Sequence, residues 1–460
     1  MRLKRWWVVL ALALVWNDAR AQDVQRRYLP NPADEDWSFL AGAPRVDPWD
    51  RLKYVPLGRA GWFMTVSGEL RYRPEGFRIR PTADRDSTVD NYLLQRYLVG
   101  SQIRMGARTR VFVEVQSGVI NGAVRSPRPT DRNRLDLHQA VISWQAARGT
   151  TRLTVDVGRQ ELAVGSTRLI SASPGLNVKR SFDGIESNIR AASWTIAAAV
   201  ARLVAVDGGS FDDRSSWRQP FWGVAASRRS PRFQRGELGG YYLGIDRPAS
   251  TYYQGVGHER RHTLGVKWTG NGTRVDLNYD ALWQWGRFAD APIRAWAFAT
   301  ETGFRPTLAW WRPRISVRAD VASGDSDPAD RALHAFNPLF PGNSYSGAVG
   351  LLGPTNLTDF TPAVVFVPRP GLTLGFEAPS YWRTSTGDGV YATDQRLLVP
   401  PTAGATRYVG TNPGILAVWQ ATRHLQAQGV ITRFLSGAFL DNTFAGPGFG
   451  FYSLSGVYRF

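Results

Sequence analysis

Apolar and polar residues alternate one by one in many short stretches of this chain of 460 residues. One such stretch runs from Arg261 to Asp280 and turns at the glycine-rich sequence Gly270-Asn271-Gly272. Its apolar residues share one side and its polar or charged residues share the other, which predicts a β-hairpin with two unlike faces. The same alternation recurs in stretches that begin at Trp62, Val111, Leu153 and Ile315.

Two folds produce this alternation, a soluble sheet with its apolar face packed inward and a membrane barrel with its apolar face toward lipid. A soluble domain of this length needs more fully apolar strands or helices than the sequence contains. No apolar run beyond residue 21 is long enough to cross a bilayer as a helix, and the mean hydropathy is -0.27. We therefore expect an all-β fold, a transmembrane antiparallel β-barrel with a polar lumen and no large buried core.

Chain length sets the size of this barrel. About 440 mature residues, at roughly 10 residues per strand plus connections, allow about 16 to 18 strands, and we expect about 18. We expect short periplasmic turns, such as Ala107-Arg108-Thr109 and Gly270-Asn271-Gly272, and long extracellular loops, such as Ser323 to Asn343. A barrel of this size encloses an aqueous channel unless loops plug it.

The first residues predict export from the cytoplasm. Met1 to Arg5 is basic, Trp6 to Trp16 is apolar, and Ala19-Arg20-Ala21 matches a signal-peptide cleavage site. A transmembrane anchor is the alternative, but the apolar run has about half of the roughly 20 residues that a spanning helix needs. We predict a signal peptide at 1–21, a periplasmic segment at 22–60 and the barrel at 61–460.

The last residues predict where the exported chain goes. Tyr452, Leu454, Tyr458 and Phe460 share one side of the final strand, and a phenylalanine ends the sequence. This ending resembles the signal by which bacterial outer-membrane proteins are recognised for barrel assembly. We therefore expect the cell outer membrane of a Gram-negative bacterium, a monomer, and contact with outer-membrane lipid and lipopolysaccharide.

Residues of common catalytic sites are absent or scattered. The chain has no cysteine, so it has neither disulfides nor thiolate ligands. Its five histidines lie in no recognisable catalytic or metal-binding motif, and Ser323-Gly324-Asp325 is not a nucleophile elbow. We predict that the chain is not an enzyme and has no cofactor.

The chain is strongly basic. Its formal net charge is +18, of which the predicted signal carries +3 through Arg2, Lys4, Arg5 and Arg20 against Asp18, leaving +15. Such a surplus predicts an anionic partner. Nucleic acid is excluded as that partner, because an exported chain rarely meets it and no nucleic-acid-binding motif is present.

Strand alternation assigns part of this charge to the lumen. Arginine stays charged and binds a carboxylate with two donors, so lumen arginines suit the path of an anionic substrate. The candidates are Arg71, Arg96, Arg104, Arg152, Arg159, Lys267, Arg274, Arg314, Arg318 and Arg459. The alternative is that they brace the wall by pairing with acidic residues of the same faces, namely Glu69, Glu114, Asp156, Asp276, Asp280 and Asp320.

One aspartate-rich connection is a candidate calcium site. Asp325, Asp327 and Asp330, with Asp320 before them, offer closely spaced carboxylates of the kind that calcium binds. The connection lacks the glycine and terminal glutamate spacing of a helical calcium-binding hand. A solvated outer loop is the favoured alternative, so we predict no bound metal.

Three stretches resemble the alginate export family of outer-membrane proteins. They are Gln95-Arg96-Tyr97, then Gly158-Arg159-Gln160-Glu161-Leu162 with Gly165 and Arg168-Leu169 after it, and Ser323-Gly324-Asp325 followed by Phe336-Asn337-Pro338-Leu339-Phe340-Pro341. The resemblance covers the chain from about Trp62 to its end, and it implies an 18-stranded barrel that exports a negatively charged exopolysaccharide. Ser166 stands where an acidic residue often follows the glycine, so a branch that does not carry alginate stays open.

The expected function follows from the barrel, its charge and this resemblance. We predict an outer-membrane channel that passes an anionic polysaccharide, an alginate-like polyuronate, outward by passive and electrostatically guided diffusion. Periplasmic secretion machinery is a further expected partner. The first alternative is a general or nutrient-uptake porin for small anionic solutes, and the second is a barrel whose long loops bind a surface partner.

Overall fold

Strands make up most of the structure, a computed structural model that describes residues 26–78, 89–124, 127–230, 236–307, 311–327, 329–342, 349–402, 404, 406–441 and 448–460. The predicted signal peptide at 1–21 and Asn343 lie outside the described residues. Among the described residues, no helix is long and apolar enough to span a membrane.

The elements follow one another as an almost unbroken series of strands. Short helical segments lie near the beginning and the end, namely η1 (Pro32–Asp34), η2 (Ser38–Ala41), α1 (Asp50–Lys53) and α2 (Ala438–Asp441). The strands are β1 (Val55–Pro56), β2 (Trp62–Arg78), β3 (Val89–Met105), β4 (Thr109–Asn121), β5 (Asn133–Arg148), β6 (Thr151–Gln160), β7 (Phe182–Ala191), β8 (Trp194–Ala205), β9 (Arg214–Ser230), β10 (Gly236–Tyr252), β11 (Gly255–Asn271), β12 (Val275–Phe288), β13 (Ala291–Phe304), β14 (Arg314–Ala322), β15 (Leu357–Arg369), β16 (Leu372–Glu377), β17 (Ser380–Arg383), β18 (Val390–Tyr391), β19 (Leu397–Val399), β20 (Tyr408–Thr411), β21 (Gly414–Gln420), β22 (Leu425–Ser436) and β23 (Phe449–Arg459).

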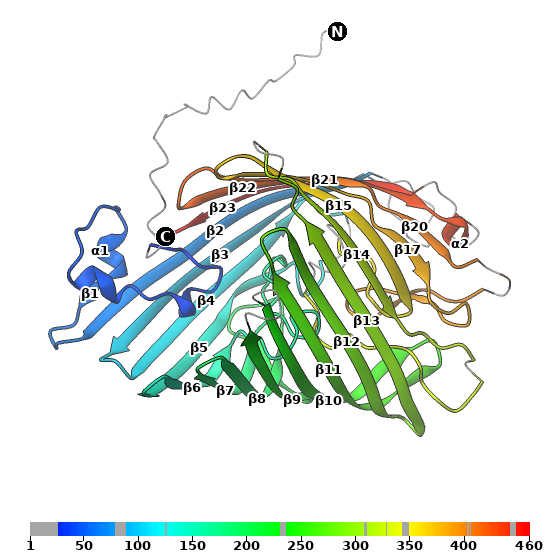
Figure 1. Cartoon of the computed structure of the whole chain (residues 1–460), viewed down its shortest axis with the longest axis horizontal. Helices are drawn as coiled ribbons and strands as arrows, with labels where there is room; N and C mark the ends of the chain where they lie inside the picture. The colour runs from blue at the N-terminus through cyan, green and yellow to red at the C-terminus, as the bar shows by residue number, and fades with distance from the viewer. Residues whose placement is uncertain are drawn as a thin grey trace, which may run out of the picture.

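All of these strands except β18 and β19, which pair only with each other, form one closed antiparallel barrel (Figure 1). Strand β2 pairs with β3 on one side and with β23 on the other, where Glu69 lies opposite Arg459, so the sheet has no free edge there. Closure satisfies the backbone polar groups of every wall strand, which a lipid environment requires. The prediction of a transmembrane-type barrel is confirmed.

The barrel wall contains 18 strands. The described sheet has 21 strands, of which β1 is a short addition beside β2. Pro379 separates β16 from β17, and Pro413 separates β20 from β21, because proline has no N–H with which to continue a ladder. Each of these two pairs makes one interrupted wall strand, which confirms the expected number.

Alternation gives the wall two chemically different faces. Leu264 and Val266 on β11 are each 52% exposed on the outside, whereas Thr263 beside them is fully buried on the inside. Exposed apolar side chains recur around the outer face, including Val99, Trp283 and Ile431. An apolar belt of this kind is what lipid contact requires.

The predicted hairpin exists, but its turn lies two residues later than expected. Asn271 still belongs to β11 and pairs with Asp276 of β12, so the turn residues are 272–274. The glycine-rich sequence therefore contributes one residue to the turn instead of three. Arg274, predicted as a strand residue, lies in this turn.

The longest connections lie at one end of the barrel, together with the two-residue turns 253–254 and 289–290, and the opposite end is called the short-turn end. The turns 106–108, 149–150 and 192–193 share one end with the C-terminus, because successive strands run in opposite directions. Among the long connections at the other end are 161–181 and 323–356. That the short-turn end faces the periplasm stays a prediction.

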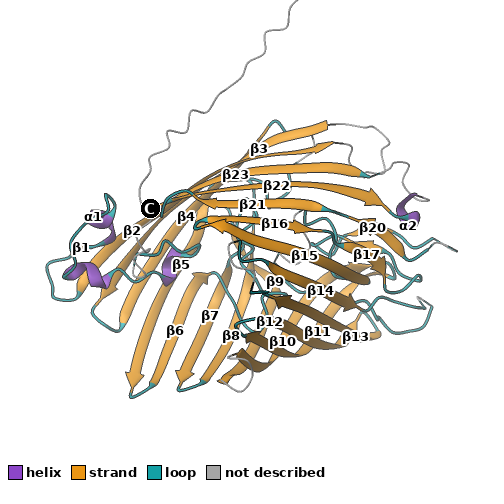
Figure 2. Ribbon diagram, turned by 45° about the horizontal axis from the view of Figure 1, so that its top comes forward, coloured by secondary structure: helices purple, strands orange, loops and turns teal. Residues whose placement is uncertain are grey.

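The interior corrects two expectations. Residues 161–181 (the first inner segment) and 323–342 (the second inner segment) fold into the barrel, and Figure 2 shows loop segments within the ring of strands. The second of these had been expected outside. Their apolar residues, among them Leu169 and Phe340, pack against inward-facing side chains of the wall such as Ala199 and Ala297. The expectation of no large buried core was therefore wrong.

The residues before the barrel lie at the short-turn end. Asn31 accepts from Gln139 of the wall at 3.0 Å, and the main-chain oxygen of Ala33 accepts from Arg110 at 2.8 Å. Trp49 stacks on the C-terminal Phe460, with ring centres 4.2 Å apart. The described residues 26–53 thus hold both the inside of the wall and the end of the chain.

Candidate functional site

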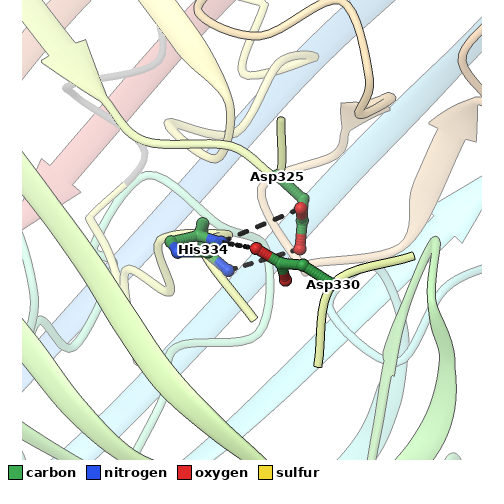
Figure 3. A group of neighbouring side chains, drawn as sticks. All are labelled: Asp325, Asp330 and His334. Carbon is green, nitrogen blue, oxygen red and sulfur yellow. Dashed lines mark hydrogen bonds and ion pairs between the residues drawn. The ribbon is translucent and has the colours of Figure 1, made fainter. Parts of the chain in front are cut away.

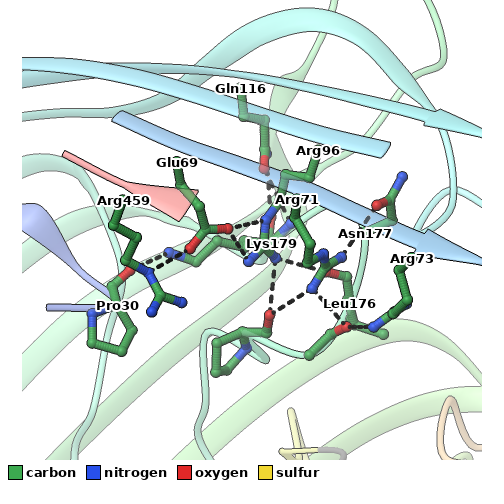
Figure 4. A network of polar contacts seen from close by, with 12 residues as sticks. Pro30, Glu69, Arg71, Arg73, Arg96, Gln116, Leu176, Asn177, Lys179 and Arg459 are labelled. Atoms are coloured by element: carbon green, nitrogen blue, oxygen red, sulfur yellow. Dashed lines mark hydrogen bonds and ion pairs between the residues drawn. The ribbon is translucent and has the colours of Figure 1, made fainter. Parts of the chain in front are cut away.

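Two arginines from adjacent wall strands hold the tip of the first inner segment (Figure 4). Arg71 on β2 donates to the main-chain oxygen of Leu176 at 2.7 Å and to Oδ1 of Asn177 at 3.1 Å. Arg96 on β3 donates to the main-chain oxygens of Pro174 and Leu176 at 2.9 and 2.8 Å. Both side chains are buried, so the oxygens of the segment take the place of water around the guanidinium groups.

A carboxylate joins this pair to the last strand. Glu69 on β2 forms an ion pair with Arg96 and accepts from Nε of Arg459 on β23 at 2.8 Å. Lys179, at the far side of the same segment, donates to the main-chain oxygen of Pro30 at 3.1 Å (Figure 4). The network therefore connects the wall, the first inner segment and the residues before the barrel.

This network carries more positive than negative charge. Its cations are Arg71, Arg73, Arg96, Lys179 and Arg459, and the carboxylates paired with them are Glu69, Glu75 and Glu161. Arg71 forms no ion pair with any described residue, because its acceptors are neutral oxygens. Pairing with acidic residues therefore accounts for Arg96 and Arg459, whereas Arg71 binds neutral oxygens of the first inner segment.

The Gly-Arg-Gln-Glu-Leu element forms the base of the first inner segment. Gly158 has a φ of +131°, and a Cβ there would lie 2.1 Å from the carbonyl oxygen of Ala140, so only glycine fits. Glu161 receives a bond from His138, whose Nε2 lies 3.1 Å away, and forms an ion pair with Lys179. Burial alone would raise the pKa of Glu161, but Lys179 and His138 outweigh it and hold that pKa at about 2.

A buried polar network holds the second inner segment. Asn337 is 1% exposed and donates to the Tyr252 hydroxyl at 2.9 Å and to Glu259 Oε1 at 3.1 Å. Arg261 donates to the same carboxylate at 2.5 Å, and Gln284 donates to the main-chain oxygen of Asn337 at 2.7 Å. These partners lie on β10, β11 and β12, so three wall strands fix the position of one asparagine.

The two inner segments contact each other at Phe340. Its N–H donates to the oxygen of Leu169 at 2.8 Å, and its own oxygen accepts from Arg180 at 2.8 Å. The guanidinium of Arg247 on β10 lies 5.0 Å from the centre of the Phe340 ring. Burial, and then the charge of Arg247, lower the pKa of Arg180 to about 10. Both arginines therefore hold the junction through carbonyl and ring contacts.

Pairs of arginines face each other across neighbouring strands of the wall. Arg71 lies opposite Arg96, Arg104 lies opposite Arg110, and Arg152 lies opposite Arg190, in each case on the inward side. Arg152 and Arg190 are both exposed and form no ion pair with another described residue. Like charges in directly opposed positions destabilise a sheet, so these inward pairs concentrate positive charge in the lumen at a cost to the wall.

Most of the other predicted cations have acidic neighbours. Arg104 contacts Asp36 at 3.1 Å, Arg314 contacts Asp276 at 2.6 Å, and Arg318 contacts Asp359 at 3.1 Å. Lys267 lies opposite the buried Asp280 in the ladder. Arg274 is exposed at the short-turn end, where it lines a hollow of about 380 Å³ with Arg305 and Arg312.

Arg159 does not belong to the lumen set. Along β6 it shares a side with Val157, which is 46% exposed on the outer face. It donates to Asp183 Oδ1 at 2.8 Å, and Asp183 shares a side with Ile185, which is 51% exposed. The lumen assignment was therefore wrong, since strand alternation itself places Arg159 with the apolar set.

The predicted calcium ligands do not come together as a trio (Figure 3). Asp325 and Asp330 bring carboxylate oxygens within 4.8 Å of each other and of a ring nitrogen of His334. Asp327 lies apart from this group and accepts from the N–H of Ala329 at 3.0 Å. Calcium takes oxygen donors, so the histidine nitrogen makes the group less suited to calcium than the sequence suggested.

Several cations of the interior were missed. Arg261 lies on the same side of β11 as Thr263 and Lys267, so the pattern that selected Lys267 would have found it. Arg168 and Arg180 lie in the first inner segment, where no periodicity signals which way a side chain faces. Arg168 contacts Asp320 of the wall at 2.8 Å.

Solved structures with the same fold are bacterial porins. A BenF-like porin from Pseudomonas fluorescens has a TM-score of 0.58 at 9% identity, over 86% of this chain and 98% of that one. OccK11 (OpdR) of Pseudomonas aeruginosa has a TM-score of 0.51 at 12% identity, over 88% and 97%. OccK2 (OpdF) of the same species, solved with glucuronate, has a TM-score of 0.54 at 11% identity, over 86% and 97%. The search of curated protein sequences returned no significant relative.

The closed barrel, its apolar outer belt and its cationic interior define an outer-membrane channel. The family model described as alginate export matches residues 63–445. The chain belongs to this alginate export family, as the three sequence stretches indicated. The family and the similar structures are channel and porin proteins, not enzymes.

Proposed function

We propose that this channel passes an anionic polysaccharide, an alginate-like polyuronate, outward by passive and electrostatically guided diffusion. The observation that carries the proposal is the set of arginine pairs on the lumen side, Arg71 with Arg96, Arg104 with Arg110, and Arg152 with Arg190. A polyuronate carries a carboxylate on each sugar. Two guanidinium groups side by side suit such a chain, because each binds a carboxylate with two donors.

The contacts of Arg71 and Arg96 support a way in which the polysaccharide would be bound. Their donors reach a row of oxygens in residues 174–177, which are main-chain carbonyls and one amide oxygen. Hydroxyl and carboxylate oxygens of a sugar chain offer the same acceptors. We infer that the first inner segment occupies positions that the polysaccharide takes once the segment moves aside.

Passage requires weak binding at many places, because a polymer held tightly at one site stalls. The pairs satisfy this requirement in different degrees. Arg104 shares its charge with Asp36, whereas Arg152 and Arg190 are exposed without an acidic partner among the described residues. Arg152 and Arg190, which are exposed near the short-turn end, attract the polymer at long range. The buried pair Arg71 and Arg96 contacts it directly.

The competing function is uptake of small anionic solutes. It is favoured by the two inner segments, which take up lumen space, and by the solved porin of the same fold with glucuronate, a single uronate. The two functions differ in the length of chain that passes. A barrel that only binds a surface partner is the third possibility, and it requires that nothing passes.

Release from liposomes distinguishes these functions. Vesicles containing the full chain are loaded with labelled polyuronate oligomers, with a neutral oligosaccharide of equal length, or with free glucuronate. Our proposal predicts release of the polyuronate faster than the neutral chain. Release of glucuronate alone would favour uptake of small anions, and retention of all three would favour the surface-binding barrel.

A further inference from the structure

The connection between β8 and β9 reaches back to β5, which lies three strands away in the wall. Leu135 on β5 forms a bridge with Ser210, and the N–H of Phe211 donates to the oxygen of Leu135 at 2.9 Å. The N–H of Arg134 donates to the oxygen of Gly209 at 3.1 Å. Residues 206–213 therefore form a strap across the long-loop end of the barrel.

Three carboxylates meet where this strap joins β5. Asp136, Asp212 and Asp213 each place one oxygen within 4.8 Å of the others. Asp136 is 2% exposed, and its Oδ2 accepts from the N–H groups of Asp212 and Asp213 at 2.8 and 3.0 Å. Three more main-chain N–H groups, of Leu137, Asp207 and Gly209, donate to the three carboxylates, but these neutral donors leave the three negative charges in place.

The positive charges near this cluster do not balance its three carboxylates. The guanidinium of Arg159 is 4.0 Å from Asp136 and is already bonded to Asp183 at 2.8 Å. Asp212 and Asp213 form no ion pair with any other described residue. Burial, and then the charge of Asp136, raise the pKa of Asp213 to about 6, as expected for crowded carboxylates.

A buried amide lies against the three carboxylates and has one oxygen without a donor. Asn133 is fully buried, and its amide is aimed into the cluster, since Nδ2 lies 2.8 Å from Asp213 Oδ2. Its Oδ1 is buried with no hydrogen-bond partner, and so is Oδ1 of Asp212. Buried acceptors without donors are costly, and a cation that bound both oxygens would satisfy them.

We propose that Asn133, Asp136, Asp212 and Asp213 form a calcium site that fastens the strap 206–213 to β5. All of the donors are oxygens from carboxylates and an amide, which calcium takes readily and in irregular geometry. The site differs in this respect from the group of Asp325, Asp330 and His334, which includes a nitrogen. It is independent of what the channel transports.

Calcium binding to the full-length, detergent-solubilised protein tests this proposal. Equilibrium dialysis with radioactive calcium should give saturable binding in this cluster with a Kd of about 10⁻⁴ to 10⁻³ M, the range of extracellular calcium modules. Asp213→Asn should weaken binding at least about tenfold, since it removes a charged ligand. Asp330→Asn, in the other acidic group, is the matched control and should bind as the wild type does.

Three results would overturn the assignment, namely no saturable binding at about 10 mM calcium, unchanged binding in Asp213→Asn, or binding lost in Asp330→Asn. Asp212→Asn, at a partly exposed position, replaces Asp213→Asn if that variant does not fold. Hydrogen exchange gives a second readout in the wild type. Calcium should slow exchange at Phe211 and Arg134 at least about tenfold relative to chelator, and equal rates would contradict the fastening role.

Discussion

Arg71, on the barrel wall, donates a hydrogen bond to the main-chain oxygen of Leu176 at 2.7 Å, across 105 positions of sequence. The contact makes a lumen cation the anchor of an inward-folded segment. It joins the two features on which the proposed function rests, the positive charge of the lumen and the segment that occupies it.

We predict that Arg71→Ala releases the tip of the first inner segment. The variant loses several hydrogen bonds from a charged donor, each worth about 1.5–3 kcal/mol, so the released state should rise at least about tenfold. Single-channel recordings should register this as longer high-conductance periods. Arg152→Ala removes the same charge without touching the segment and is the control. Equal recordings for the two variants would contradict an anchoring role for Arg71.

The fold was predictable because lipid and water impose a period of two on every wall strand. Leu264, Val266 and Thr263 obey it, and closure then follows from the absence of other ways to satisfy the backbone. The inner segments were not predictable in this way. Leu339 and Phe340 follow Asn337-Pro338, in a stretch with no period, and their burial depends on contacts with residues as distant as Leu169 and Arg247.

The candidate site shows the same division. Strand alternation predicted that Arg71, Arg96 and Arg152 face the lumen. The same pattern includes Arg261, which was not selected. Their partners were not predictable, since the acceptors of Arg71 are carbonyl oxygens that any sequence offers. The pairing of Arg152 with Arg190 required the strand register, which hydrophobic patterning alone does not fix to the residue.

The glycine of the Gly-Arg-Gln-Glu-Leu element should be essential for the wall. Gly158→Ala places a Cβ 2.1 Å from the Ala140 oxygen at a φ of +131°. Strain of this kind costs about 1–3 kcal/mol or more, so the variant should unfold at lower urea concentration or fail to form the barrel. Gly456→Ala, in β23 with nothing within 4 Å of its Cβ, is the control. Similar urea midpoints of unfolding for Gly158→Ala and Gly456→Ala would show that Gly158 is replaceable.

The second inner segment should depend on one buried amide. Asn337→Ala removes one hydrogen bond to Glu259 and one to Tyr252, which both keep bonds from Arg261, and the loss of two buried hydrogen bonds costs about 1–3 kcal/mol. Hydrogen exchange in residues 329–342 should accelerate by about 5- to 150-fold. Asp327→Asn in the same connection keeps its local hydrogen bond and should exchange as the wild type does. A slow-exchanging Asn337→Ala would show that the apolar contacts alone hold the segment.

Acid should loosen the first inner segment through Glu161. The folded state lowers the pKa of Glu161 from 4.5 to about 2, so its contribution to stability is present above pH 4.5 and is lost as pH falls through about 2. Exchange in the first inner segment should therefore accelerate between these two values. Glu161→Gln should show a weaker dependence in that window. An unchanged pH profile in the variant would mean that other carboxylates control the segment.

The most direct test of the central claim is the reversal potential of single channels in a planar bilayer under a salt gradient. In the lumen variant, Arg152 and Arg190 are both replaced by glutamine. In the outer-face variant, glutamine replaces the cross-strand pair Arg260 and Arg287. We predict anion selectivity and block by polyuronate for the wild type and the outer-face variant, and a marked loss of both in the lumen variant. A cation-selective wild type, or equal selectivity in both variants, would contradict the claim that lumen arginines guide an anionic chain.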